Sequence, residues 1–198
     1  WICIVFFLAE NSLIKKVMKN LRVILLIVSL NSILSAQPTI QWQRTFGGSS
    51  AEEAKSIQQT GDGGYILTGK TLSFDGDVNK NQGGNDFWVI KLDALGEIQW
   101  QNTYGGSNND RSYDIQQTLD GGYIVAGQTE SEDGDVTGFH GDKDCWVLKL
   151  SDVGDIQWQK ALGGGGWDQA WSVRQTLDEG YIIAGHADSE DGDVTGNH

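Results

Sequence analysis

The sequence predicts an all-β protein: a fragment of a β-propeller built from four-stranded repeats of 58 residues and preceded by a signal peptide. The repeat is the first observation, because Ile40-Gln41-Trp42 returns as Ile98-Gln99-Trp100 and again as Ile156-Gln157-Trp158, 58 residues apart each time. A fixed period of this size indicates stacked or radially arranged units. The second observation is that apolar residues alternate with polar ones in these segments, which is the period of a half-buried strand.

The first 36 residues are expected to lie outside the repeats. Met18 is the first methionine, and the positive residues Lys19 and Arg22 precede an apolar run over 23–30. Small residues, Ser35-Ala36, follow, which completes the pattern of a secretory signal peptide. We therefore expect residues 1–17 to precede the true start, residues 18–36 to be a signal peptide, and residues 37–198 to be β-propeller repeats. A membrane anchor is the alternative, but it needs ~20 apolar residues.

Each repeat is expected to supply four short antiparallel strands, which is the content of one propeller blade. The copies begin at residues 40, 98 and 156, and the last copy is truncated. In chain order, we expect the innermost strand at 56–59, the second at 65–69, the third at 87–92, and the outermost at 98–104 from the next copy. A Gly-rich turn precedes the second strand, and a long loop over 71–85 precedes the third.

Three segments of the second copy carry a family resemblance: Tyr104 to Ser107, Asp120 to Gly127 and Gly141 to Leu150. They read Tyr-Gly-Gly-Ser, Asp-Gly-Gly-Tyr-Ile-Val-Ala-Gly and Gly-Asp-Lys-Asp-Cys-Trp-Val-Leu-Lys-Leu. This pattern resembles the SBBP-type β-propeller repeats of secreted bacterial proteins, over residues 40–198. Such repeats occur in Bacteroidetes-like proteins that use type IX secretion. The resemblance therefore implies a secreted or cell-surface protein.

The charge of the chain narrows the class of partner. The net charge is −13. Removal of residues 1–36 would leave 26 acidic and 10 basic side chains, because that segment holds one acid and four bases. Such a surface repels nucleic acid and anionic lipid, and it attracts divalent cations. We expect an extracellular protein or glycan as partner, no nucleic acid, and no membrane insertion of the mature chain.

A repeated Asp-Gly-Asp motif is the candidate metal site. Calcium prefers six to eight oxygen ligands, and two carboxylates in a tight loop supply some of them. The alternative is that aspartate and glycine only form the turns, since aspartate accepts backbone N–H bonds there. Asp86 and Asp144, at strand entries, are expected to hold turns in the same way. The candidate Ca²⁺ ligands are Asp75, Asp77, Asp133, Asp135, Asp191 and Asp193.

Two tryptophans, Trp167 and Trp171, are candidate ligand-binding residues, because they replace Asn109 and Tyr113 of the preceding copy. An exposed aromatic ring near a loop can stack on a sugar, although local packing is the alternative. The tryptophans that recur in the copies are expected to pack between blades.

The function that these features favour is a secreted or cell-surface, non-catalytic module for protein or glycan binding and adhesion. One alternative is the propeller region of a polysaccharide-acting hydrolase or lyase whose catalytic part lies elsewhere, and another is a structural spacer. Hydrolysis of a glycosidic bond needs one particular pair of carboxyl groups, and the repeated acids single out no such pair. We therefore assign no catalytic residue and no cofactor other than the candidate Ca²⁺.

Overall fold

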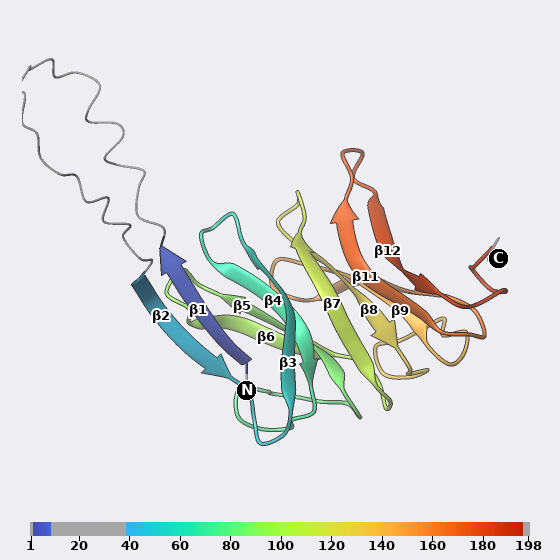
Figure 1. Cartoon of the computed structure of the whole chain (residues 1–198), viewed down its shortest axis with the longest axis horizontal. Helices are drawn as coiled ribbons and strands as arrows, with labels where there is room; N and C mark the ends of the chain where they lie inside the picture. The colour runs from blue at the N-terminus through green and yellow to red at the C-terminus, as the bar shows by residue number, and fades with distance from the viewer. Residues whose placement is uncertain (1, 9–38, 196–198) are drawn as a thin grey trace, which may run out of the picture. The chain divides into compact units, whose positions relative to one another are not determined.

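The computed structural model describes residues 2–8 and 39–195, and every regular element in these ranges is a β-strand (Figure 1). The chain divides into two compact units, and all strands from β3 onward belong to one of them. Strands β1 (Ile2–Leu8) and β2 (Thr39–Phe46) form a two-stranded sheet, most of which belongs to the other. The predicted signal peptide, residues 18–36, lies outside the described residues.

Strands β3 to β12 form three antiparallel sheets, one for each copy of the repeat. The first two sheets have four strands each, in the orders β3-β4-β5-β6 and β7-β8-β9-β10, and β11 pairs with β12. The all-β class and the predicted strand order are therefore confirmed. In each four-stranded sheet the fourth strand begins the next copy of the sequence repeat. The strands are β3 (Glu52–Gln59), β4 (Tyr65–Thr71), β5 (Asp86–Leu92), β6 (Ile98–Tyr104), β7 (Asp110–Gln117), β8 (Tyr123–Thr129), β9 (Asp144–Leu150), β10 (Ile156–Leu162), β11 (Asp168–Gln175) and β12 (Tyr181–Ala187).

A bulge interrupts the first strand of every sheet at the same repeat position. The register shifts between Ala54 and Ser56 in β3, and at the equivalent places in β7 and β11. A bulge adds one residue to a strand and breaks its period-two alternation. For this reason the alternation in the sequence predicts only 56–59, whereas the strand begins at Glu52.

Apolar side chains pack between consecutive sheets and form the core. One cluster joins residues of the first sheet, such as Phe87, to residues of the second, such as Tyr123 and Trp146. The rings of Phe87 and Trp146 meet edge to face, with centroids 4.7 Å apart. A second cluster joins the second sheet to Ala170 and Val173 of β11. Full burial of side chains of this size stabilises the fold by about 1.5–3 kcal/mol each.

Glutamine side chains link the first strands of neighbouring sheets. The side chain of Gln58 accepts a hydrogen bond from the backbone N–H of Gln117 (2.7 Å), and the side chain of Gln117 accepts one from Gly61 (2.8 Å). The same two hydrogen bonds recur between β7 and β11. The side chain of Gln116 accepts a bond from Gln175 N–H (2.8 Å), and the side chain of Gln175 accepts one from Leu119 N–H (2.9 Å). In Figure 1, β7 lies between β4 and β11, in agreement with its contacts to both.

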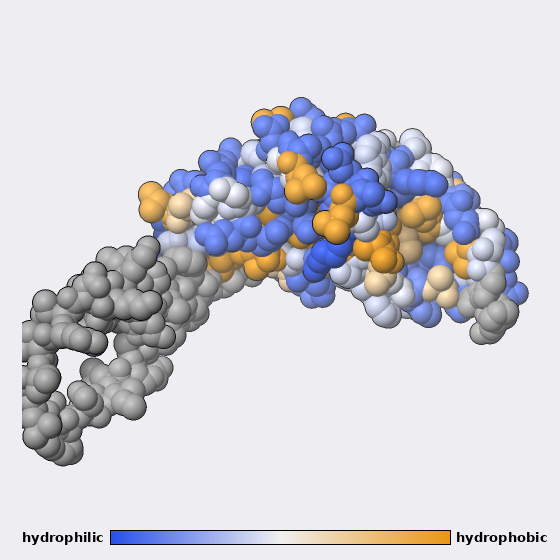
Figure 2. All heavy atoms as spheres, turned by 90° about the horizontal axis from the view of Figure 1, so that it is seen from above, coloured by the Kyte–Doolittle hydropathy of each residue, from blue (hydrophilic) through white to orange (hydrophobic). Residues whose placement is uncertain are grey.

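The face of the molecule shown in Figure 2 is predominantly hydrophilic, with hydrophobic side chains in small separate groups. This distribution fits a chain with a net charge of −13. Within residues 2–8 and 39–195, we find no helix with the length and hydropathy needed to cross a membrane.

Candidate functional site

The Asp-Gly-Asp loops lie against the Gly-Gly turns that precede the first strand of the same sheet. In the second sheet, Asp133 Oδ1 accepts a hydrogen bond from Ser107 N–H (2.7 Å), and Asp135 Oδ2 accepts one from Gly105 N–H (3.2 Å). The other loops repeat these contacts: Asp75 with Ser49 (2.8 Å), Asp77 with Gly47 (3.0 Å), Asp191 with Gly165 (2.7 Å), and the backbone N–H of Asp193 with the carbonyl of Gly163 (2.8 Å). Each loop is therefore joined to its turn by carboxylate or backbone bonds.

If the aspartates form the turns, their side chains should accept backbone N–H bonds in this way. These hydrogen bonds use carboxylate oxygens that a bound calcium ion would need as ligands. In the part of the chain that the structure describes, no group of three or more acidic, histidine or cysteine side chains is arranged to hold a metal ion. Calcium binding by the six aspartates stays a prediction.

A second set of carboxyl groups is buried where consecutive sheets meet. Asp86 begins β5 of the first sheet, Asp110 begins β7 of the second, and both side chains are fully buried. Asp144 and Asp168 occupy the equivalent positions between the second and third sheets, and they are equally buried. Sequence reasoning placed Asp86 and Asp144 at strand entries but did not predict that each faces a second buried carboxyl group.

The surroundings of these carboxyl groups shift their ionisation. Burial raises the pKa of Asp86 to about 7, and the nearby charges of Asp110 and Asp135 add to the increase. Burial also raises the pKa values of Asp110 and Asp144. His140 contacts Asp144 through Nδ1 (2.8 Å), whereas the equivalent residue of the first repeat is Gln82.

Trp167 and Trp171, the candidate ligand-binding residues, come together around His186. The Trp171 ring stacks on His186 with an interplanar angle of 12°, and Trp167 meets the same imidazole edge-on. The Lys143 ammonium lies 4.2 Å from the centroid of the Trp167 ring. Trp167 and Trp171 are 42% and 55% exposed, although His186 covers one face of the Trp171 ring and Lys143 lies over the ring of Trp167. We call Trp167, Trp171 and His186 the aromatic cluster.

The sequence signal for this cluster was incomplete. His186 replaces Gln128 of the second repeat and Lys70 of the first, as Trp167 and Trp171 replace Asn109 and Tyr113. All three positions carry a different residue in each copy, so variation between the copies marks them. The pairing of β11 with β12, which places Gln169 opposite His186, brings them together and could not be seen in the sequence itself.

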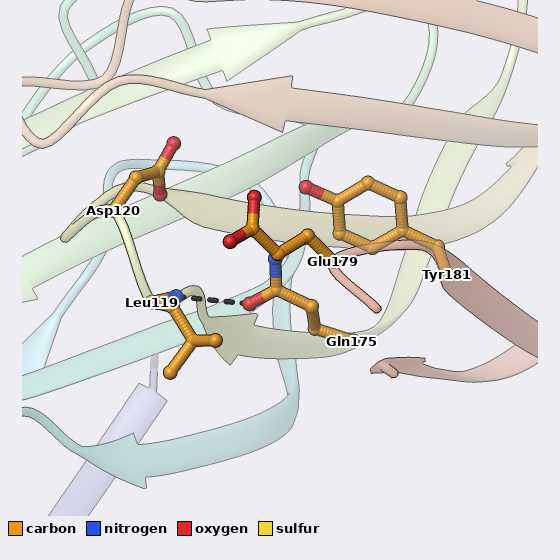
Figure 3. A pocket seen from close by; sticks show the side chains of 5 residues that line it. All are labelled: Leu119, Asp120, Gln175, Glu179 and Tyr181. Carbon is orange, nitrogen blue, oxygen red and sulfur yellow. Dashed lines mark hydrogen bonds between the residues drawn. The ribbon is translucent and has the colours of Figure 1, made fainter. Parts of the chain in front are cut away.

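A cavity of about 250 Å³ lies between the turns of the second and third sheets (Figure 3). Leu119, Asp120, Gln175, Glu179 and Tyr181 line it. Two of its polar side chains already have partners: Gln175 accepts from Leu119 N–H, and Asp120 accepts from Lys149 Nζ (2.9 Å) and Thr118 Oγ1 (2.5 Å). The cavity therefore offers a weaker case for ligand binding than the aromatic cluster does.

Comparison with known proteins finds no family model and no curated protein that matches the chain. The resemblance to SBBP-type repeats therefore stays a prediction.

Proposed function

We propose that the chain is a non-catalytic β-propeller repeat module that is secreted or held at the cell surface, where it binds an extracellular glycan. A protein ligand is the alternative on the same surface. One observation carries the proposal: Trp167, Trp171 and His186 gather in one exposed cluster, at positions where the other repeats carry unrelated side chains.

The sheet arrangement supports a propeller architecture. The second 58-residue copy contributes β7, β8 and β9 to one sheet and its first strand, β6, to the sheet before it, and β10 of the third copy likewise completes the second sheet. Consecutive sheets pack face to face, as the shared clusters of Phe87 with Trp146 and of Ala126 with Val173 indicate. Four-stranded antiparallel units that are stacked in this way are the building blocks of propellers.

The chemistry of the aromatic cluster suits a neutral sugar. Indole rings provide a large, rigid apolar face together with a polar edge, which fits the apolar C–H face and the hydroxyl groups of a pyranose. The net charge of −13 disfavours polyanionic glycans by long-range repulsion. A glycan of neutral hexoses or N-acetylhexosamines is therefore the ligand class that we propose.

The uniformity of the repeated acids supports a non-catalytic role. Asp75, Asp133 and Asp191 each accept a backbone N–H from the equivalent residue of their own repeat. Acid–base catalysis needs two titratable groups whose environments differ, so that one gives a proton while the other takes one. Near-identical loops do not create that difference.

The test is calorimetric titration of the chain with neutral hexasaccharides of glucose, mannose and N-acetylglucosamine. We expect at least one to bind, and Trp171→Ala to weaken that binding about tenfold, since a lost stacking contact is worth ~1 kcal/mol or more. Trp171→Phe keeps a ring and should retain most of the affinity. Tyr113→Ala, at the same position of the second repeat, is the matched control and should bind as the wild type does. Equal binding by Trp171→Ala, or no binding to any of the sugars, would reject the glycan proposal.

A further inference from the structure

The starting observation is a pair of buried carboxyl groups at each contact between consecutive sheets. We call Asp86 with Asp110 the first junction and Asp144 with Asp168 the second junction. All four side chains are at most 1% exposed. A backbone hydrogen bond fixes each pair, from Asp110 N–H to the Asn85 carbonyl (2.5 Å) and from Asp168 N–H to the Lys143 carbonyl (2.7 Å).

One glycine separates the two carboxyl groups of each junction. A Cβ atom built on Gly105 would lie 2.6 Å from Asp86 Oδ1 and 2.6 Å from Asp110 Oδ2. A Cβ atom on Gly163 would lie 2.7 Å from the equivalent oxygens of Asp144 and Asp168. The two oxygens of a junction therefore border the same small space, which only the absence of a side chain keeps open.

The two members of each junction have different hydrogen-bond partners. Asp110 accepts bonds from Thr129 Oγ1, from Ser131 Oγ (2.8 Å) and from Gly106 N–H (2.8 Å). Asp86 accepts one bond at Oδ2, from Gln82 N–H (2.7 Å), and its Oδ1 has no partner. Asp144 Oδ1 is also without a partner. The three donors to Asp110 favour its ionised form, whereas a bare buried oxygen disfavours ionisation of Asp86 and Asp144.

We propose that each junction holds one proton, carried by Asp86 in the first and by Asp144 in the second, and that loss of this proton loosens the contact between the sheets. Each junction has one carboxyl oxygen without a hydrogen-bond partner, Oδ1 of Asp86 or of Asp144, and this oxygen is where the proton would bind. A calcium ion would need about six to eight oxygen ligands, and donors already occupy both oxygens of Asp110. The proposal concerns stability and goes beyond glycan binding.

Other titratable groups face these carboxyls. The groups around Asp86 are Asp110 from β7, Asp135 from the Asp-Gly-Asp loop, and Lys80 from the loop before β5. Asp144 faces His140 and Asp168, and His140 Nε2 lies 4.0 Å from Asp193. Cys145 lies beside Asp168 and Asp144, but burial raises the pKa of its thiol to about 12, so it stays neutral. Gln82, which has no titratable group, takes the place of His140 in the first repeat, so Asp86 gives the cleaner test.

The direction of the pH effect follows from linkage. The pKa of Asp86 is raised in the folded protein to about 7, from an ordinary value of ~3.9. A group of this kind contributes stability that is fully present below its unfolded pKa and is lost as pH rises through its folded pKa. Between these two values, unfolding releases the proton of Asp86, and the unfolding equilibrium constant increases by about tenfold per pH unit for this group.

The experiment is urea unfolding of the full chain at a series of pH values from 4 to 8. Asp86→Asn replaces the protonated carboxyl with a neutral group of the same shape. We expect this variant to reduce the slope of the logarithm of the unfolding constant against pH by about one. Asp152→Asn, which removes an exposed carboxyl group, is the matched control and should keep the wild-type slope. An unchanged slope in Asp86→Asn would overturn the proposal.

A second readout needs no comparison of stabilities. A protonated carboxyl group has its own carbonyl band in the infrared spectrum, distinct from that of carboxylate. At pH 6, we expect this band in the wild type and a weaker band in Asp86→Asn. Absence of the band from the folded wild type at pH 6 would also overturn the proposal, even if the variants do not fold.

Discussion

At the scale of single residues, Gly127 shows how tightly the centre of a sheet is packed. A Cβ atom on Gly127 would lie 2.1 Å from the carbonyl oxygen of Arg111 and 2.7 Å from Cζ of Phe87. Gly69 and Gly185, at the equivalent positions, have even closer approaches to the neighbouring strand, at 1.8 Å. These glycines all lie beside the bulge of the first strand, so the close approach is part of the repeat.

We expect Gly127→Ala to lower the free energy of unfolding by at least about 1–3 kcal/mol, because the backbone on one side and a core ring on the other leave no room for a methyl group. Urea denaturation followed by circular dichroism measures this change. Gly61→Ala is the control, since its nearest neighbour would be Gln117 Oε1 at 3.7 Å. It should change stability by less than about 0.5 kcal/mol. Similar losses in both variants would contradict the steric explanation.

Sequence reasoning at this scale succeeded for local contacts and failed for contacts between sheets. A turn-forming role for Asp133 was one of two interpretations, because aspartate bonds to nearby backbone in tight loops. The pairing of Asp86 with Asp110 was not predicted. These residues belong to different sheets, and only the packing of one sheet on the next brings them together.

At the scale of strands and turns, a buried lysine joins the third strand of each complete sheet to a turn. The Lys149 side chain is 4% exposed, and its Nζ contacts Asp120 (2.9 Å), the Leu150 carbonyl (3.0 Å) and Gln157 Oε1 (3.0 Å). Lys91 and Asp62 repeat the pair in the first sheet. Hydrogen bonds from Thr118 and Lys149 lower the pKa of Asp120 to about 2.

Asp120→Asn is expected to lower the free energy of unfolding by about 1–2 kcal/mol at neutral pH, since it leaves a buried ammonium group without its carboxylate partner. Because the folded pKa of Asp120 is depressed, its contribution is present above ~3.9 and is lost as pH falls through about 2. Urea unfolding at pH 6 and pH 2 should therefore show a smaller difference between the variant and the wild type at pH 2. Lys149→Met and the double variant complete the cycle, and strictly additive losses would contradict a direct pair.

Strand positions were predicted well where apolar residues alternate or run together. The segment 65–69 became β4 (Tyr65–Thr71), and 87–92 became β5 (Asp86–Leu92). In the second sheet, the equivalent apolar segment is β8, which lies between β7 and β9 and has all its residues buried. The first strand of each sheet was predicted too short because its bulge breaks the alternation.

At the scale of the whole repeat array, neighbouring sheets are joined by apolar packing and by glutamine side chains. The hydrogen bond that the Gln116 side chain accepts from the backbone N–H of Gln175 joins the second sheet to the third. In an array of this kind, each unit draws its stability from the units beside it, so a weakened contact uncouples their unfolding.

We expect Gln116→Ala to remove about 1 kcal/mol from the contact between the second and third sheets. The third sheet should then unfold at a lower urea concentration than the rest of the array. Exchange of backbone amide hydrogens, followed by mass spectrometry of peptides from β8 and β12, separates the two transitions. Gln116→Glu keeps an acceptor oxygen and serves as the control, because it should retain the wild-type coupling. Unchanged protection of β12 in Gln116→Ala would show that the bond from Gln175 to Gln116 does not couple these sheets.

The repeat predicted the composition and strand order of the sheets because one pattern occurs three times in the sequence. Closure into a ring, export and the ligand remain proposals. They depend on how many sheets assemble and on partners outside the molecule, and strand patterns within one repeat do not encode these properties.

The sequence repeat and the sheets begin at different residues, and this offset affects how an array of such repeats can lengthen by gene duplication. Residues 52–104 form one complete sheet, and residues 110–162 form the next. Only the segment 105–109 connects them. A gene duplication whose boundaries fall in this connection adds a whole sheet whose four strands all come from one copy, whereas a duplication that begins at Ile98 creates a sheet whose fourth strand comes from another copy. Recombination within the Gly-Gly segments therefore lengthens or shortens an array of this type while each sheet keeps its own strand partners.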